Sequence, residues 1–140
     1  MKKKILIVFS DYYNDISDNL LDGALKHLQK TYNLNLVNKY VVYTRVPGVF
    51  EIPVTIATRI KEYDGFIALG CVIKGQTPHF DFISRATTDA IMRLSVDYKK
   101  PIGNGIITAL NMSQAKKRSF IKGKEAANAV IKIIKNGQYR

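Results

Sequence analysis

The sequence is poor in cysteine and in long apolar runs, and each scarcity excludes a class of protein. Cys71 is the only cysteine among the 140 residues, so no internal disulfide can form and a reducing compartment is expected. The apolar run at residues 5–9 is too short for a signal peptide, which needs about 7–15 apolar residues, or for a membrane span, which needs about 20. We therefore expect a cytoplasmic protein that does not associate with membranes.

Acidic residues are also scarce relative to basic ones. Lys and Arg together number 22 against 11 for Asp and Glu, which gives a net charge of +11. A solvated basic surface is the simplest explanation, anionic substrates such as phosphates come second, and nucleic acid comes third. No homeodomain, zinc-finger or RNA-binding signature accompanies the charge. We therefore expect small-molecule substrates and no nucleic-acid partner.

Apolar runs alternate with amphipathic segments along a single domain, residues 1–140, without a linker or internal repeat. Strands are predicted at 4–10, 34–42, 65–74 and 101–110, and helices within 14–32, 44–64, 77–98, 113–118 and 124–137. The run at 65–74 is the most apolar and is expected at the centre of the sheet, whereas 34–42 is expected nearer an edge. The alternation predicts a three-layer αβα fold, with a flavodoxin-like, four-stranded parallel sheet and helices on both faces.

The sequence "GQTPHF" at 75–80 follows the most apolar strand, and parallel sheets bind ligands beyond the carboxyl ends of their strands. Its glycine allows a tight turn, Thr77 suits a helix N-cap, and Pro78 suits the first helical position. Backbone N–H groups near Gln76 and Thr77 would then attract an anion, above all phosphate. His79 would stand beside them, and a histidine side chain exchanges protons near neutral pH. The pattern alone leaves open a plain helix start with a solvated His79.

Other stretches at strand ends offer further ligand contacts. "VPGVFEIP" at 46–53 places Glu51 in the first turn of a helix, where it either complements the helix dipole or holds a polyhydroxy ligand. Tyr13 in "DYYND" could stack on a flat heterocycle or pack as a half-buried loop residue. "GNG" at 103–105 permits close approach of a backbone or of a crossing helix. Cys71, inside an apolar run, is interpreted as a buried core thiol.

Several common site motifs do not occur. The glycines lack the spacing of a Walker A loop or a dinucleotide-binding fingerprint. No Cys/His cluster has metal-ligand spacing, and no carboxylate pair is obvious. The residues by themselves therefore indicate an anion site with a histidine.

Together, these stretches resemble the lumazine synthase family of riboflavin biosynthesis. "VPGVFEIP", "ALGCVIKGQTPHFDFI", "PIGNGIIT" and "KGKEAA" occur in the family's order and spacing. The resemblance implies a cofactor-free condensation of 5-amino-6-(D-ribitylamino)uracil with 3,4-dihydroxy-2-butanone 4-phosphate, which forms 6,7-dimethyl-8-ribityllumazine and releases phosphate and water. It also implies a homo-oligomer, either a pentamer or a pentamer-based shell, with riboflavin synthase as a candidate partner. The alternative is a non-catalytic flavin- or lumazine-binding module of the same fold, which would not need His79 or Arg118.

The resemblance also implies roles for individual residues. His79 would move the protons, and Tyr13 would stack on the pyrimidine ring. The contacts to the ring and ribityl chain within one subunit would come from Tyr13, Val49, Phe50, Glu51, Cys71, Val72 and Ile73.

The remaining implied residues concern the phosphate and the subunit boundary. Gln76 and Thr77 would hold the phosphate. Asn104 and Arg118 match positions that the family draws from a neighbouring subunit, with Arg118 on the phosphate. Lys122 matches a lysine near the ribityl chain, and only "SFI" separates it from Arg118, where the family usually has a longer, glycine-containing loop.

Overall fold

Strands and helices alternate in the computed structural model, which describes residues 2–33, 35–75 and 79–138. The elements are β1 (Ile5–Ser10), α1 (Asn14–Thr31), α2 (Val37–Tyr40), β2 (Val41–Val46), the 3₁₀ helix η1 (Val49–Glu51), α3 (Ile52–Thr58), β3 (Gly65–Ile73), α4 (Phe80–Tyr98), β4 (Ile102–Ala109) and α5 (Met112–Gln138).

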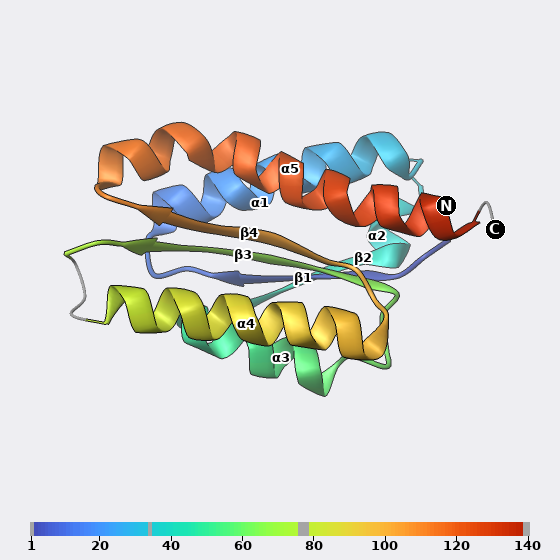
Figure 1. The fold of residues 1–140 in the computed structure, drawn as a ribbon. Helices are drawn as coiled ribbons and strands as arrows, with labels where there is room; N and C mark the ends of the chain where they lie inside the picture. The colour runs from blue at the N-terminus through green and yellow to red at the C-terminus, as the bar shows by residue number, and fades with distance from the viewer. Residues whose placement is uncertain (1, 34, 76–78, 139–140) are drawn as a thin grey trace.

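The four strands form one parallel sheet in the order β2-β1-β3-β4. Helices α1 and α5 cover one face, and α3 and α4 cover the other (Figure 1). All residues of β3 are buried, and this strand lies inside the sheet, whereas β2 lies at an edge. The predicted three-layer parallel fold is therefore confirmed, together with the predicted places of these two strands.

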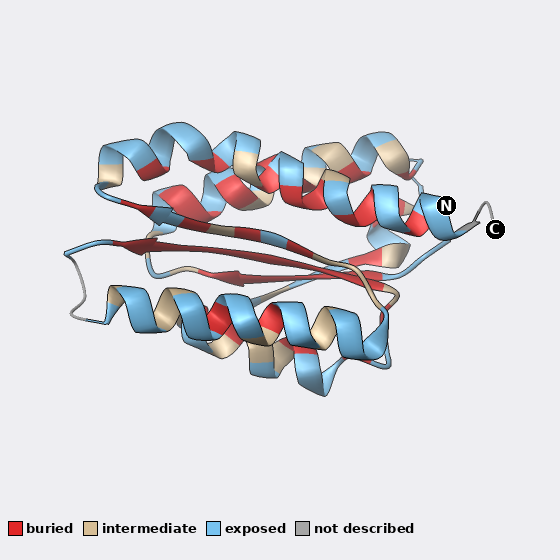
Figure 2. Ribbon diagram, in the orientation of Figure 1, coloured by how far each residue is buried: buried red, intermediate tan, exposed pale blue. Residues whose placement is uncertain are grey.

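Each face of the sheet has its own apolar core, because successive side chains of a strand point to opposite faces. Along β1, Ile5 and Ile7 belong to the core beneath α1 and α5. The alternate residues Leu6 and Val8 belong to the core beneath α3 and α4. Buried residues accordingly fill the two inner strands, β1 and β3, and the helix faces turned toward them (Figure 2). This continuous burial leaves the ends of the strands as the places where ligands can reach the sheet.

The prediction of two separate helices at 113–118 and 124–137 is wrong, because these segments belong to one helix, α5. Gly123 lies inside it, where a Cβ atom would stand 2.0 Å from the carbonyl oxygen of Leu20 in α1. Gly23 of α1 makes the reciprocal close approach to α5. The glycine therefore allows two helices to pack backbone to backbone and does not end either of them.

The strand predicted at 34–42 is also wrong over its first part. The carbonyl oxygen of Asn33 accepts the N–H groups of Leu36 and Val37 at 2.9 and 3.1 Å. These bonds start a turn that continues into the short helix α2. The strand therefore begins only at Val41, where the chain reaches the edge of the sheet beside β1.

Candidate active site

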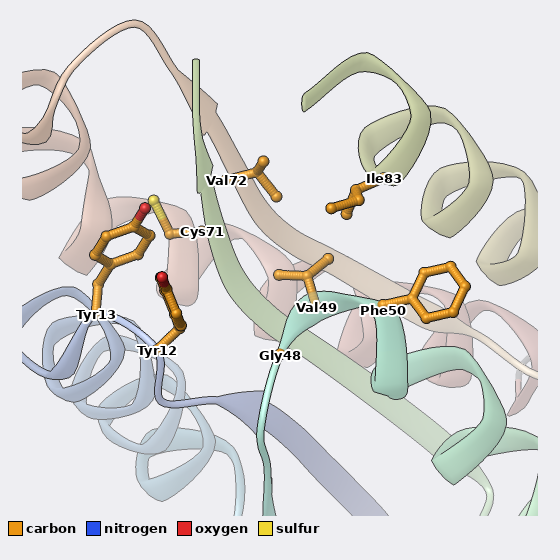
Figure 3. A pocket seen from close by; sticks show the side chains of 8 residues that line it. All are labelled: Tyr12, Tyr13, Gly48, Val49, Phe50, Cys71, Val72 and Ile83. Carbon is orange, nitrogen blue, oxygen red and sulfur yellow. The ribbon is translucent and has the colours of Figure 1, made fainter. Parts of the chain in front are cut away.

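A hollow of about 250 Å³ opens at the carboxyl end of the sheet, where the sequence predicts a site (Figure 3). The residues that line it are Tyr12, Tyr13, Gly48, Val49, Phe50, Cys71, Val72 and Ile83. They come from the β1–α1 loop, the turn before α3, the end of β3 and the start of α4. Folding thus brings together five predicted ligand contacts, namely Tyr13, Val49, Phe50, Cys71 and Val72.

The two tyrosines occupy different environments, and sequence reasoning named only one of them. Tyr13 is the N-cap residue of α1 and packs against the core. The side chain of Tyr12 is 69% exposed, and the two rings meet edge to face at 4.9 Å. Tyr12 therefore presents the more accessible aromatic surface to the pocket. Adjacent aromatic residues in a strand-to-helix loop were the available signal, but only the loop backbone decides which ring is exposed.

Cys71 and Val72 are neighbours at the end of β3 and point to opposite faces of the sheet. Cys71 belongs to the core under α1 and α5, and Val72 to the core under α3 and α4. Burial raises the pKa of the Cys71 thiol to about 11, an effect that the charge of Arg118 partly opposes. The thiol is therefore protonated at neutral pH, and the predicted buried core thiol is confirmed. Cys71 serves as an apolar wall and not as a thiolate nucleophile.

Tyr13 is likewise unsuited to exchange protons at neutral pH. Burial is the main cause that raises the pKa of its phenol above the usual value, with smaller contributions from Cys71 and Tyr12. The Tyr13 phenol and the Cys71 thiol therefore both keep their protons at neutral pH.

The chain leaves β3 through the turn that the sequence predicts. Gly75 has φ 85°, a left-handed conformation that glycine adopts at little cost. The predicted phosphate contacts of Gln76 and Thr77 lie outside the described residues. Their role therefore stays a prediction.

The helix that follows begins at Phe80, later than the predicted start at Thr77. Its N-cap is His79, whose backbone at φ −112° and ψ 23° lies outside the helical region. The carbonyl oxygen of His79 accepts the N–H of Ile83 at 2.9 Å, and Ile83 lines the pocket. His79 is exposed, with its ring centroid 6.4 Å from that of Phe82. The histidine thus stands at the start of a long helix, one turn from the pocket wall.

Glu51 lies beside the pocket and does not line it. It is the last residue of η1 and the N-cap residue of α3, where its carbonyl oxygen accepts the Thr55 hydroxyl at 2.8 Å. Its neighbours in an adjacent hollow of about 490 Å³ are Phe50, Pro53, Val54, Ala86, Thr87 and Ala90. Phe50, which is 65% exposed, lines both hollows. A Cβ atom at Gly48, which lines the first hollow, would lie 3.1 Å from Glu51 Oε1.

Ile73 and Asn104 lie away from the pocket lining. Ile73 is 1% exposed, so only its backbone could meet a ligand. Asn104 is halfway along β4, and its Oδ1 accepts the amide N–H two residues further on at 3.0 Å. The neighbouring Gly103 allows a tight helix crossing, since a Cβ atom there would lie 2.2 Å from the Ala126 carbonyl oxygen of α5. The "GNG" stretch therefore serves helix packing within this chain.

Arg118 and Lys122 lie together on α5 and do not line the aromatic pocket. Both line a hollow of about 260 Å³ on α5, with Lys117, Ile121 and Glu125. Because α5 is continuous, residues four positions apart are neighbours on its surface. The charge of Arg118 nevertheless reaches Cys71, whose pKa it lowers. The predicted site residues therefore form two groups in one chain, the aromatic pocket and a cationic cluster.

The pocket offers an apolar slot with an aromatic face, which suits a flat ring. His79 is the N-cap residue of the helix that contributes Ile83 to the pocket wall. Among residues 2–33, 35–75 and 79–138, no three His, Cys, Asp or Glu side chains group as ligands for a metal ion. No helix in that part of the chain combines the length and apolar character needed to cross a membrane.

Comparison with known proteins identifies the family. The family model described as 6,7-dimethyl-8-ribityllumazine synthase matches residues 2–137. A protein of that name from Buchnera aphidicola subsp. Baizongia pistaciae is 40% identical over 139 residues, covering 95% of this chain and 86% of the relative. The relative from Bartonella bacilliformis is 43% identical over 138 residues, covering 93% and 87%. That from Agrobacterium fabrum is 41% identical over 144 residues, covering 95% and 93%. The chain belongs to the 6,7-dimethyl-8-ribityllumazine synthase family.

Proposed function

We propose that this protein is a transferase of riboflavin biosynthesis that makes 6,7-dimethyl-8-ribityllumazine. Its substrates would be 5-amino-6-(D-ribitylamino)uracil and 3,4-dihydroxy-2-butanone 4-phosphate. The observation that carries the proposal is the apolar pocket at the carboxyl end of the sheet in a chain of this family. An exposed tyrosine in the pocket and a histidine one helical turn from the lining residue Ile83 would supply what such a condensation needs.

The uracil ring would stack on the exposed face of Tyr12, with Tyr13 behind it as an edge-on support. Val49 and Val72 would form the apolar wall on the other side. The ribityl chain would run along the turn toward Glu51, which lies beyond Phe50. We therefore propose Tyr12 as the residue on which the ring stacks, in place of Tyr13, which the sequence predicted.

The reaction requires proton transfer and positioning. The 5-amino group attacks the ketone, and water leaves as the imine forms. Loss of a proton from the adjacent carbon lets phosphate leave by elimination. The ribitylamino nitrogen then closes the ring with loss of a second water. An imidazole at the entrance, that of His79, would accept the carbon-bound proton and return one to a departing oxygen.

The phosphate would bind at the start of α4, because the first N–H groups of a helix have no acceptor within the helix and the helix dipole favours an anion there. Arg118 would add a bidentate contact. Since Arg118 lies outside the pocket in its own chain, we propose that it serves the site of a neighbouring copy.

We propose a homo-oligomer, a pentamer or a pentamer-based shell in the cytoplasm, in which a second copy covers the apolar face of α4. Three large side chains of that helix are uncovered, with exposed fractions of 77% for Phe82, 63% for Met92 and 65% for Val96. Riboflavin synthase would consume the product.

The test is to mix the purified protein with both substrates and follow lumazine absorbance and fluorescence. We expect a rate that saturates with each substrate and exceeds that of a blank without protein. The blank is essential because the substrates condense spontaneously. Binding of lumazine or flavin with no rate above the blank would contradict the proposal and indicate a non-catalytic binding module.

A further inference from the structure

The loop that carries both pocket tyrosines is short. Strand β1 ends at Ser10 and helix α1 begins at Asn14, so Tyr12 and Tyr13 stand between two rigid elements. The N-cap residue of α1 is Tyr13, and it makes no side-chain capping hydrogen bond. Tyr13 therefore does not stabilise the helix start in the way that a Ser, Thr, Asp or Asn cap usually does.

Ser17 joins the two ends of this loop. Its hydroxyl donates to the carbonyl oxygen of Ser10 at 2.5 Å, and its backbone N–H donates to the carbonyl oxygen of Tyr13 at 2.9 Å. Ser17 and Ser10 are only 4% and 3% exposed. Because water cannot easily replace a buried bond, loss of this hydroxyl would leave a buried carbonyl group without its partner.

The base of the loop rests on the floor of the pocket. A Cβ atom at Gly70 of β3 would lie 2.7 Å from both Ser10 Oγ and Val49 Cγ2. Ser10 and the pocket residue Val49 therefore both lie close above the backbone of Gly70. A shift of Ser10 would disturb the pocket directly.

An exposed ion pair also ties the loop, and it is weaker than the Ser17 bond. Asp11 pairs with Arg45 at 3.3 Å, with side-chain exposures of 33% and 67%. Exposed ion pairs contribute little, since water and salt screen them. The buried Ser17 bond is therefore the stronger constraint on where the tyrosines stand.

We propose that Ser17 is a positioning residue, whose hydroxyl holds the β1–α1 loop so that Tyr12 and Tyr13 face the pocket before the ring substrate binds. This inference rests on the proposed function. Without this bond, the loop would become ordered only when the substrate binds. The free energy needed to order it would lower the affinity for that substrate. The effect should fall on the ribitylaminouracil, which the tyrosines would contact, and spare the butanone phosphate and the chemical steps.

The experiment compares Ser17→Ala, Ser17→Thr and the wild-type protein by steady-state kinetics. For Ser17→Ala we expect the KM for the ribitylaminouracil to rise roughly three- to tenfold, as for loss of one hydrogen bond, with kcat unchanged. The KM for the butanone phosphate should stay within about twofold of wild type. The loop would contact only the ribitylaminouracil, so a loss of binding there raises the KM of that substrate alone. Ser17→Thr keeps the hydroxyl and should restore the wild-type KM.

Ser95→Ala is the matched control. Ser95 is a half-buried helix residue whose hydroxyl donates to the Lys100 carbonyl oxygen at 2.6 Å, at the opposite end of α4 from His79. Its loss should lower Tm without changing either KM, because partial unfolding reduces the amount of active protein and therefore only the apparent kcat. Hydrogen–deuterium exchange should speed up in residues 11–16 of Ser17→Ala and not of Ser95→Ala.

A KM in Ser17→Ala within twofold of wild type, or an equal rise in Ser95→Ala, would overturn the proposal. Should Ser17→Ala not fold, Ser17→Cys is tested instead, because a thiol is similar in size to a hydroxyl and a weaker donor. The KM for the ribitylaminouracil should again rise, with the KM for the butanone phosphate unchanged. If the wild-type protein makes no product, the proposed function fails and the positioning role in that reaction fails with it. The exchange data then show separately whether Ser17 holds the loop.

Discussion

Arg118 donates from Nη1 to the carbonyl oxygen of Thr108, 3.5 Å away, which joins α5 to the end of β4. The bond is long and exposed, so it holds the guanidinium weakly at the carboxyl edge of the sheet. A phosphate offers the same group two short, charge-assisted bonds. In the proposed function, Arg118 would exchange this weak internal partner for the phosphate of a substrate.

We predict that Arg118→Lys raises the KM for the butanone phosphate by roughly tenfold or more, and the KM for the ribitylaminouracil much less. A lysine cannot reproduce the planar bidentate contact of a guanidinium. Inorganic phosphate should compete with the phosphorylated substrate in the wild-type protein and more weakly in the variant. Initial rates over a grid of both substrates and phosphate measure these effects.

Arg59→Lys is the control for that variant, since Arg59 is an exposed residue at the end of α3 that pairs with Glu62. It should leave both KM values unchanged. Equal changes in the two KM values for Arg118→Lys, or no inhibition by phosphate, would argue against a phosphate contact of Arg118.

We predict that His79→Ala lowers kcat by roughly 10²- to 10⁴-fold, the usual size of a general acid–base contribution. The rate of spontaneous condensation must be subtracted before the comparison. His27→Gln serves as the control, because His27 lies on α1 and should not alter kcat. Turnover of His79→Ala near the wild-type value would remove this residue from the mechanism.

We predict that two nearly inactive variants, His79→Ala and Arg118→Ala, regain activity when unfolded and refolded together. If the histidine of one copy works with the arginine of the next, random mixing in a ring leaves roughly one site in four intact. Each variant refolded alone provides the baseline. No recovery, with mixed oligomers demonstrated by mass spectrometry, would show that both residues act within one chain.

We predict that the protein becomes less stable on acidification because of His27. Burial is the first cause that lowers the pKa of His27 below its ordinary value of 6.5, followed by the charges of Lys124, Lys30 and Lys135, while a hydrogen bond to the Asn128 side chain opposes them. The unfolded chain therefore takes up a proton more readily than the folded protein. The contribution of His27 to the free energy of unfolding is therefore fully present above about pH 6.5. It is lost as the pH falls through that value.

Thermal unfolding between pH 7.5 and pH 5 measures this effect. We expect Tm to fall with pH in the wild-type protein and less steeply in His27→Gln, whose side chain does not titrate. Asp and Glu titrate mostly below this range, so their contribution should be similar in both proteins. An identical slope in the two proteins would show that His27 does not cause the loss.

The sequence alone was sufficient for the parallel αβα arrangement, because apolar runs and helical periodicity are local properties. The high apolar content of 65–74 and the lower content of 34–42 also indicated which strand is central and which lies at an edge. Since all strands of a parallel sheet end on one side, the site could be predicted there before any side chain was placed. His79 and the glycine turn at Gly75 followed from the same local signals.

Only the tertiary structure decided the features that depend on contacts between distant segments. α5 is continuous because Gly123 meets the Leu20 carbonyl oxygen of another helix, a contact that periodicity cannot reveal. Tyr12 presents the exposed ring because Tyr13 packs on the core as the N-cap residue of α1. Sequence spacing predicts the side of an element on which a residue lies. What covers that side depends on the packing of the whole chain, and this is why Arg118 lines a hollow on α5 and not the aromatic pocket.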